Sequence, residues 1–116
     1  MQEKLQKIKA KCQELLKLGE ERTQGTWWDI ETRNGEQVIR TGNPTHTGTD
    51  ICEVYSHDSE FIASCAGPAE AGWRATIAAI DGWIFILDNA KDQDLQTLAR
   101  SNLYSIINAW PDELLK

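Results

Sequence analysis

The chain has 116 residues, of which 41% are hydrophobic and five are tryptophan. This is the size and apolar content of one compact core, so we expect residues 1–116 to form a single domain. The formal net charge of −6 argues against direct binding to nucleic acid, because a phosphate backbone is bound by clustered Lys and Arg that displace its counterions.

The sequence has the features of neither a secretory signal nor a membrane span. The residues after Met1 mix charged and apolar side chains, whereas a signal peptide has a basic start and a continuous apolar stretch. The longest apolar run, Trp83 to Leu87, is too short to cross a bilayer. The three cysteines are odd in number and irregularly spaced, which is typical of reduced thiols. We therefore expect a cytoplasmic protein that does not bind membranes.

Residues 2–18 have the spacing of an amphipathic helix. Apolar side chains recur every three or four positions and form one stripe on such a helix: Leu5, Ile8, Cys12, Leu15 and Leu16. Gly19 is expected to end the helix, because glycine readily takes the left-handed conformation that closes a last turn. The stripe suits packing inside the chain and equally suits a partner helix, and we expect self-association through this N-terminal helix to give a homodimer.

Residues 26–55 are predicted to form a three-stranded antiparallel meander. The segments "TWWDIET" and "EQVIRT" are β-prone and flank Asn34-Gly35, a strong hairpin signal because both residues accept positive φ. Residues 42–50 have the composition of a loop, and "ICEVYS", which starts at Ile51, is predicted to be the third strand. Such a small sheet is stable only when one face is covered, and we expect the helices to cover it.

The remainder of the chain, residues 58–115, is predicted to be helical. Ser56 or Asp58 is expected to cap a short helix whose apolar face is Phe61, Ile62 and Cys65. Gly67-Pro68 ends that helix and starts the next, because proline in a first turn loses no needed hydrogen bond.

Two longer helices follow that break. The first carries Trp73, Ile77, Ile80 and Ile84 at helical spacing. Residues 82–88, "GWIFILD", suit either a continuation of this helix or a buried strand, and Leu87 favours the helix because it extends the stripe. Asp92 or Asp94 is expected to cap the last helix, and Pro111 to end it before "DELLK" adds one turn. The stripe of the last helix is Leu95, Leu98, Leu103, Ile106, Ile107 and Trp110.

The predicted fold class is therefore α+β. It consists of an N-terminal helix (residues 1–19), a three-stranded antiparallel β-meander (residues 26–55) and a C-terminal layer of two to three helices (residues 58–115).

The sequence contains histidines and cysteines, which are common in metal and catalytic sites, but they are not spaced along the chain as in such sites. His46, Cys52, His57 and Cys65 fall within twenty residues, but no gap matches the short paired spacing of a zinc knuckle. We expect Cys52 in the core by strand alternation and Cys65 on the same helix face as Phe61. On one helix, the eight residues from His57 to Cys65 would span about 12 Å, too far for a nucleophile and its base. We predict no enzymatic activity, no metal and no cofactor.

The tryptophans indicate a binding surface. Trp27 and Trp28 are adjacent on a predicted strand and point to opposite faces, so one of them is either exposed or covered by another element. An exposed tryptophan is a suitable anchor for a protein partner, and the predicted partner-binding residues are Trp27, Trp28, Arg40 and Arg74. The alternative is a pocket between sheet and helices that binds a nucleotide or second messenger, with a tryptophan stacked on its ring and Arg40 or Arg74 supplying positive charge.

Three features in chain order form a recognisable pattern: a charged N-terminal helix, the segment "TQGTWW", and "DSEFIASCAGPAEAGWRATIAAID" after a short β region. This pattern resembles the Ead-like family of small proteins from the early regions of lambdoid phages and from prophages. The likeness covers about residues 5–80. The matching positions are Thr23, Gly25, Trp27, Ser59, Phe61, Ile62, Ala63 and Pro68.

The chain departs from the family pattern at several places. Gln24 stands where the family usually has proline, Asp58-Ser59 replaces a common Asn-Ala, and "IINAWPDELLK" lies outside the pattern. The resemblance implies that Trp27 packs with Phe61, and that the chain is a phage or prophage accessory protein without enzymatic activity. From the resemblance, the small size and the acidity we expect it to bind a host protein in the bacterial cytoplasm, for example to inhibit a defence or regulatory complex.

Overall fold

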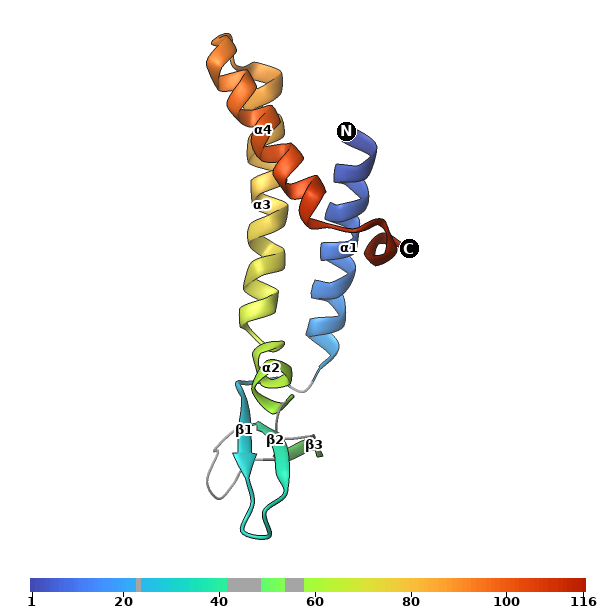
Figure 1. The fold of residues 1–116 in the computed structure, drawn as a ribbon, viewed down its shortest axis with the longest axis vertical. Helices are drawn as coiled ribbons and strands as arrows, with labels where there is room; N and C mark the ends of the chain where they lie inside the picture. Colours follow the sequence, from blue (N-terminus) through green and yellow to red (C-terminus); the bar gives the residue numbers. More distant parts are fainter. Residues whose placement is uncertain (23, 42–48, 54–57) are drawn as a thin grey trace. The chain divides into compact units, whose positions relative to one another are not determined.

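The computed structural model describes residues 1–22, 24–41, 49–53 and 58–116 (Figure 1). In chain order its elements are α1 (Gln2–Glu21), β1 (Trp27–Glu31), β2 (Gln37–Thr41), β3 (Thr49–Glu53), α2 (Ser59–Ser64), α3 (Pro68–Asn89), α4 (Gln93–Ala109) and the 3-10 helix η1 (Asp112–Leu115). The α+β class predicted from the sequence is confirmed: an N-terminal helix, a three-stranded antiparallel sheet, then C-terminal helices.

These elements form two compact units. The helical unit consists of Met1–Leu16 and Gly72–Lys116, and the sheet unit consists of Lys17–Ala71. None of the helices in the described part of the chain has the length and apolar character that crossing a membrane requires.

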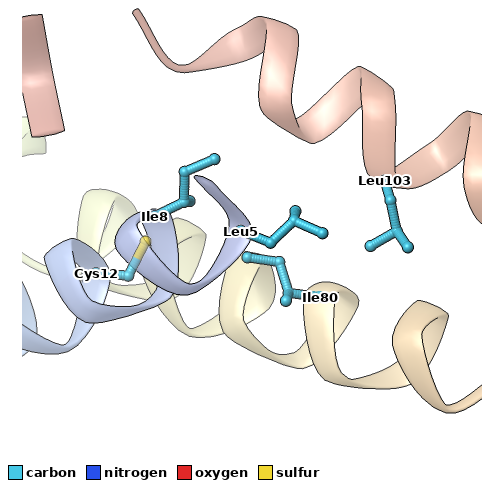
Figure 2. Close-up of a cluster of buried hydrophobic side chains, with 5 residues drawn as sticks. All are labelled: Leu5, Ile8, Cys12, Ile80 and Leu103. Atoms are coloured by element: carbon cyan, nitrogen blue, oxygen red, sulfur yellow. The ribbon is translucent and has the colours of Figure 1, made fainter. Parts of the chain in front are cut away.

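The core of the helical unit joins α1, α3 and α4. Leu5, Ile8 and Cys12 of α1 meet Ile80 of α3 and Leu103 of α4, and all five side chains are fully buried (Figure 2). Around them pack the partly buried residues Trp73, Ile77, Trp83, Ile84, Leu87, Ile106, Ile107, Trp110 and Leu115. The stripe predicted on α3 and the residues Leu5, Ile8 and Cys12 of the α1 stripe are thus core positions, because side chains three and four residues apart share one face of a helix. Leu15 and Leu16, the other two residues of the α1 stripe, are partly buried.

The ends of α3 and α4 follow local signals. Gly67 has φ +85° and α3 starts at Pro68, as predicted, and α3 continues to Asn89, so the 82–88 segment is helical. Asp92 is the N-cap of α4, where its carboxylate accepts a hydrogen bond of 2.8 Å from the amide of Asp94. Pro111 separates α4 from η1.

The predicted stripe of α4 is correct only in its second half. Leu95 and Leu98 are 45% and 48% exposed, whereas Ala99 and Leu103 are fully buried. At 3.6 residues per turn, Leu95 lies about 80° and Leu98 about 140° around the helix from Leu103. The core-facing side of α4 in its first turns is therefore occupied by the smaller Ala99.

The sheet unit contains the three antiparallel strands in the order β1-β2-β3, and α2 contacts β1 and β2. The central strand β2 buries a side chain on each face, Val38 and Ile39. Strand β3 starts at Thr49, two residues before its predicted start. The end predicted for this strand, Val54–Ser56, and the predicted loop residues 42–48 lie outside the described residues, as do His46 and His57.

The turn between β1 and β2 differs from the prediction in type. Only Gly35 has positive φ, at +82°, and Asn34 does not. The Gly35 amide donates to the Thr32 carbonyl at 2.9 Å and the Thr32 amide donates to the Glu36 carbonyl at 2.8 Å. The connection is therefore a three-residue loop, in which a turn at Arg33 and Asn34 is followed by a left-handed glycine.

The expectation that Gly19 ends α1 is wrong, because the helix continues to Glu21. The side-chain amide of Gln24 folds back and donates to the carbonyls of Gly19, Glu20 and Arg22 at 3.1, 2.9 and 3.0 Å. The carbonyls of Gly19 and Glu20 are in the last turn of α1, where they lack intrahelical partners, and Arg22 follows the helix directly. The side chain of Gln24, three residues beyond α1, therefore caps this helix, a role predicted for Gly19.

The apolar face predicted for α2 is wrong at Phe61 and Cys65, whereas its third residue, Ile62, is partly buried. Phe61 is 74% exposed and Cys65 is exposed, while Ser59 and Ala66 are buried. Cys52 of β3 is exposed as well, contrary to its predicted place in the core. Small residues permit the close approach of a short helix to a sheet, and the large side chain of Phe61 remains on the outer side of α2.

Candidate functional site

Trp28, Arg40 and Asp50 form one row across the sheet. The strand register pairs Trp28 of β1 with Arg40 of β2, and Arg40 with Asp50 of β3, next to an irregularity between Ile39 and Arg40. The Arg40 Nε donates to Asp50 Oδ1 at 2.6 Å. The Arg40 side chain is 18% exposed and that of Asp50 is 50% exposed. Arg40 is therefore held in place by an ion pair within the sheet.

Trp28 is the exposed member of the tryptophan pair, with 42% of its surface accessible. It stands directly across from Arg40, so an aromatic ring and a guanidinium held by a carboxylate adjoin one another on the sheet. This combination of a partly exposed aromatic residue and fixed charge is typical of positions that contribute strongly to protein interfaces.

Trp27 is partly buried and has a structural role. It lies on the opposite face of β1 and pairs with Thr41, which is 8% exposed. The guanidinium carbon of Arg22 is 5.5 Å from the centre of the Trp27 ring, a cation–π contact. Phe61, which the resemblance implies packs with Trp27, has 74% of its surface exposed.

The Trp27 side chain is part of a polar cluster that we call the Arg22 cluster: Gly19, Arg22, Gln24, Gly25, Trp27, Thr41 and Glu70. Arg22 Nε donates to Glu70 Oε1 at 2.6 Å, and the two side chains are only 17% and 12% exposed. Arg22 also donates to the Gly25 carbonyl at 3.1 Å. Glu70 lies in the first turn of α3, where the helix dipole favours a carboxylate.

Gly25 has a conformational and a steric reason to be glycine. Its φ is +102°, and a Cβ at this position would lie 2.9 Å from the hydroxyl oxygen of Thr41. That hydroxyl donates to the Gln24 carbonyl at 2.9 Å. Gly25 and Trp27 of the "TQGTWW" segment therefore position the start of the sheet against the end of α1 within the sheet unit.

The four residues predicted to bind a partner do not form one site within the sheet unit. Trp28 and Arg40 are neighbours, and Trp27 lies on the other face of the same strand. Arg74 belongs to α3 in the helical unit, where it is exposed. Sequence reasoning missed Phe61 as an exposed residue, because the buried residues here are the small Ser59 of α2 and Ala66 just after it, whereas the pattern of large apolar residues pointed to the opposite face.

Two features of the described residues bear on metal and small-ligand binding. Among them, no group of three or more His, Cys, Asp or Glu side chains is arranged to hold a metal ion. An open cavity of about 470 Å³ lies in the helical unit, lined by Met1, Glu3, Lys4, Lys7, Asp112, Leu115 and Lys116. None of the residues predicted for the nucleotide pocket lines this cavity.

Comparison with known proteins found no match among family models, curated proteins or solved structures.

Proposed function

We propose that this protein is a nonenzymatic phage or prophage accessory protein that binds a host protein through its sheet unit. The observation that carries the proposal is the exposure of two large aromatic side chains, Trp28 at 42% and Phe61 at 74%, on elements of one small unit. Aromatic side chains contribute large contact area at a low cost in conformational entropy, and they are frequent among the residues that dominate binding energy.

The contact between α2 and the sheet supports a common surface for these residues. Helix α2, which carries Phe61, packs on β1, which carries Trp28. The sheet unit is small, and its buried hydrophobic residues are Val38, Ile39 and Ala66. Trp28 and Phe61 are therefore available to a partner without any opening of the core.

The acidic side chains of the sheet unit indicate what kind of partner surface it would bind. Half of the Asp50 side chain is accessible beside Arg40, in the row that contains Trp28, and the exposed Asp29 and Glu31 lie on the other face of β1. The whole chain carries a formal charge of −6. A basic protein surface with an apolar pocket is complementary to these features, and the nucleic-acid-binding surface of a host defence or regulatory complex has this character. Inhibition by occupying such a surface is the form of action we propose.

The biological setting rests on the resemblance of "TQGTWW" and the α2–α3 segment to the Ead-like family. The roles of Gly25 and Trp27 in the Arg22 cluster give a physical reason for those residue types in such a segment. Gln24, where the family usually has proline, supplies the amide that caps α1. The departure from the family pattern thus has a structural function in this chain.

The test is affinity purification of the tagged protein from infected or prophage-bearing bacteria, with mass spectrometry of the proteins and of small molecules released by denaturation. We expect a stoichiometric host protein. Trp28→Ala and Phe61→Ala should each reduce its recovery at least tenfold, which corresponds to more than about 1.4 kcal/mol of binding free energy. Binding should also weaken as the salt concentration rises.

Tyr104→Ala is the matched control, because Tyr104 is an aromatic residue of similar exposure, 48%, on α4 of the helical unit. It should leave recovery of the partner unchanged. The proposal fails if no stoichiometric protein is recovered, or if the partner is retained by both sheet-unit variants while circular dichroism shows that they are folded. A released nucleotide without a protein would favour the small-ligand alternative.

A further inference from the structure

Helix α3 has a second, outward face whose residues are exposed. Arg74, Ala75, Ala78, Gly82 and Phe85 are all exposed, and Phe85 is 67% exposed. Their spacing of three and four residues places them in one stripe, on the side of α3 opposite the fully buried Ile80. A Cβ built on Gly82 meets no atom within 4 Å, so this part of the stripe is open.

The outward face is asymmetric along the helix in both size and charge. Its first part has Arg74 and the small residues Ala75 and Ala78, and its second part has the large Phe85 followed by Asp88. Within the described part of the chain, neither Arg74 nor Asp88 forms an ion pair. Asp81, which also borders the face, is paired with Lys9 at 2.7 Å.

This asymmetry makes the face complementary to a second copy of itself in antiparallel orientation. When Phe85 of one copy lies opposite Ala78 of the other, two-fold symmetry places Ala78 of the first opposite Phe85 of the second. In the same register Arg74 comes opposite position 89, within one residue, or about 1.5 Å of rise, of Asp88. Large side chains then meet small ones and positive charge meets negative charge at both ends of the contact.

We infer that α3 mediates self-association of this protein through the outward face Arg74, Ala75, Ala78, Gly82, Phe85 and Asp88, paired antiparallel with the same face of a second copy. The small residues at its centre let two helices approach closely, and the phenylalanines fill the space beside them. The surface differs from the stripe of α1, which is fully buried in the helical core at Leu5, Ile8 and Cys12. One helix face is smaller than a standard protein interface, so the dimer forms in a concentration-dependent manner.

Charge reversal tests this pairing by sedimentation equilibrium of the full chain over a wide concentration range. Arg74→Asp and Asp88→Arg should each weaken dimerisation at least tenfold, because like charges then meet at both ends. The double variant Arg74→Asp with Asp88→Arg should restore the dissociation constant to within about threefold of the original protein. Arg100→Asp, which makes the same charge change at an exposed position of α4, is the control and should have no effect.

Cross-linking tests the register independently of stability. In a background with Cys52→Ser and Cys65→Ser, Gly82→Cys lies next to the two-fold axis and should form a disulfide-linked dimer on oxidation with copper phenanthroline. Thr97→Cys, an exposed position on α4, should not.

The inference is overturned if the protein is monomeric at every concentration, if single charge reversals leave dimerisation unchanged, or if the double variant fails to restore it. Trp28→Ala should leave dimerisation intact, which separates this contact from partner binding by the sheet unit.

Discussion

Cys12 differs from the other two cysteines in accessibility. It is fully buried between Leu5, Ile8 and their partners on α3 and α4, whereas Cys52 and Cys65 are exposed. Burial disfavours the charged thiolate and raises the pKa of Cys12 above its ordinary value. Since the thiolate is the reactive form, both access and ionisation protect this residue.

We therefore predict that a thiol reagent such as DTNB modifies two cysteines rapidly in the folded protein and the third only after denaturation. The measurement is the rate of thionitrobenzoate release with and without guanidinium. In a Cys52→Ser/Cys65→Ser variant the rapid phase should disappear. Rapid release from Cys12 in that folded variant would mean that the helical core opens readily, contrary to the full burial of this side chain.

At the scale of the elements, two helical glycines have opposite environments. A Cβ on Gly19 of α1 would lie 2.8 Å from the Glu70 carboxylate, which is held in place by Arg22 at 2.6 Å. A Cβ on Gly72 of α3 would meet nothing within 4 Å. Gly19 therefore allows the Arg22–Glu70 ion pair to lie close to the backbone of α1. Gly72 is not needed for any contact of the described residues.

Replacement of each glycine by alanine should therefore change stability in opposite directions. Gly72→Ala should raise the free energy of unfolding by about 0.5–1 kcal/mol, because alanine is the better helix former. Gly19→Ala has the same propensity gain but displaces a nearly buried carboxylate, and we expect a net loss of about 1 kcal/mol. Urea denaturation of both variants measures the difference. An equal gain for both would show that Glu70 moves aside without cost.

The elements that could be predicted from the sequence are those fixed by near neighbours. The stripes containing Leu5, Ile8 and Ile80, the Gly67-Pro68 break and the Asp92 cap all depend on residues within a few positions of one another. The end of α1 was mispredicted because it depends on the side chain of Gln24, three residues beyond the helix.

The surface residues were harder to predict than the elements. Trp27 and Trp28 are both tryptophans on one strand, and the sequence does not tell that Trp27, whose ring contacts Arg22, is the partly buried one and Trp28 the exposed one. Phe61 was mispredicted because the size of a side chain alone does not tell which side of a short helix faces the sheet. Arg74 was predicted from its residue type, and its place on the outward face of α3 follows only from knowing which side of that helix is buried.

At the scale of the whole molecule, segments that are far apart in the sequence belong to the same compact unit. The helical unit is made from residues 1–16 together with residues 72–116, and the sheet unit is formed by the segment between them. The core of the helical unit therefore requires contacts between residues far apart in sequence, such as Leu5 with its neighbours Ile80 and Leu103. Such contacts form only after a long loop has been closed, which costs conformational entropy.

The N-terminal segment is thus predicted to be essential to the helical unit, and two leucines of α1 test this. Leu5 is fully buried in that core, whereas Leu18 is 55% exposed. Leu5→Ala removes buried methyl groups and leaves a cavity, so we expect it to lower the free energy of unfolding by about 2–5 kcal/mol. Leu18→Ala makes the same chemical change on the same helix and should cost less than about 0.5 kcal/mol.

Urea denaturation followed by tryptophan fluorescence measures both free energies of unfolding, since Trp73, Trp83 and Trp110 pack against the core that Leu5 completes. Equal effects of the two substitutions would mean that residues 1–16 are dispensable for the packing of α3 and α4.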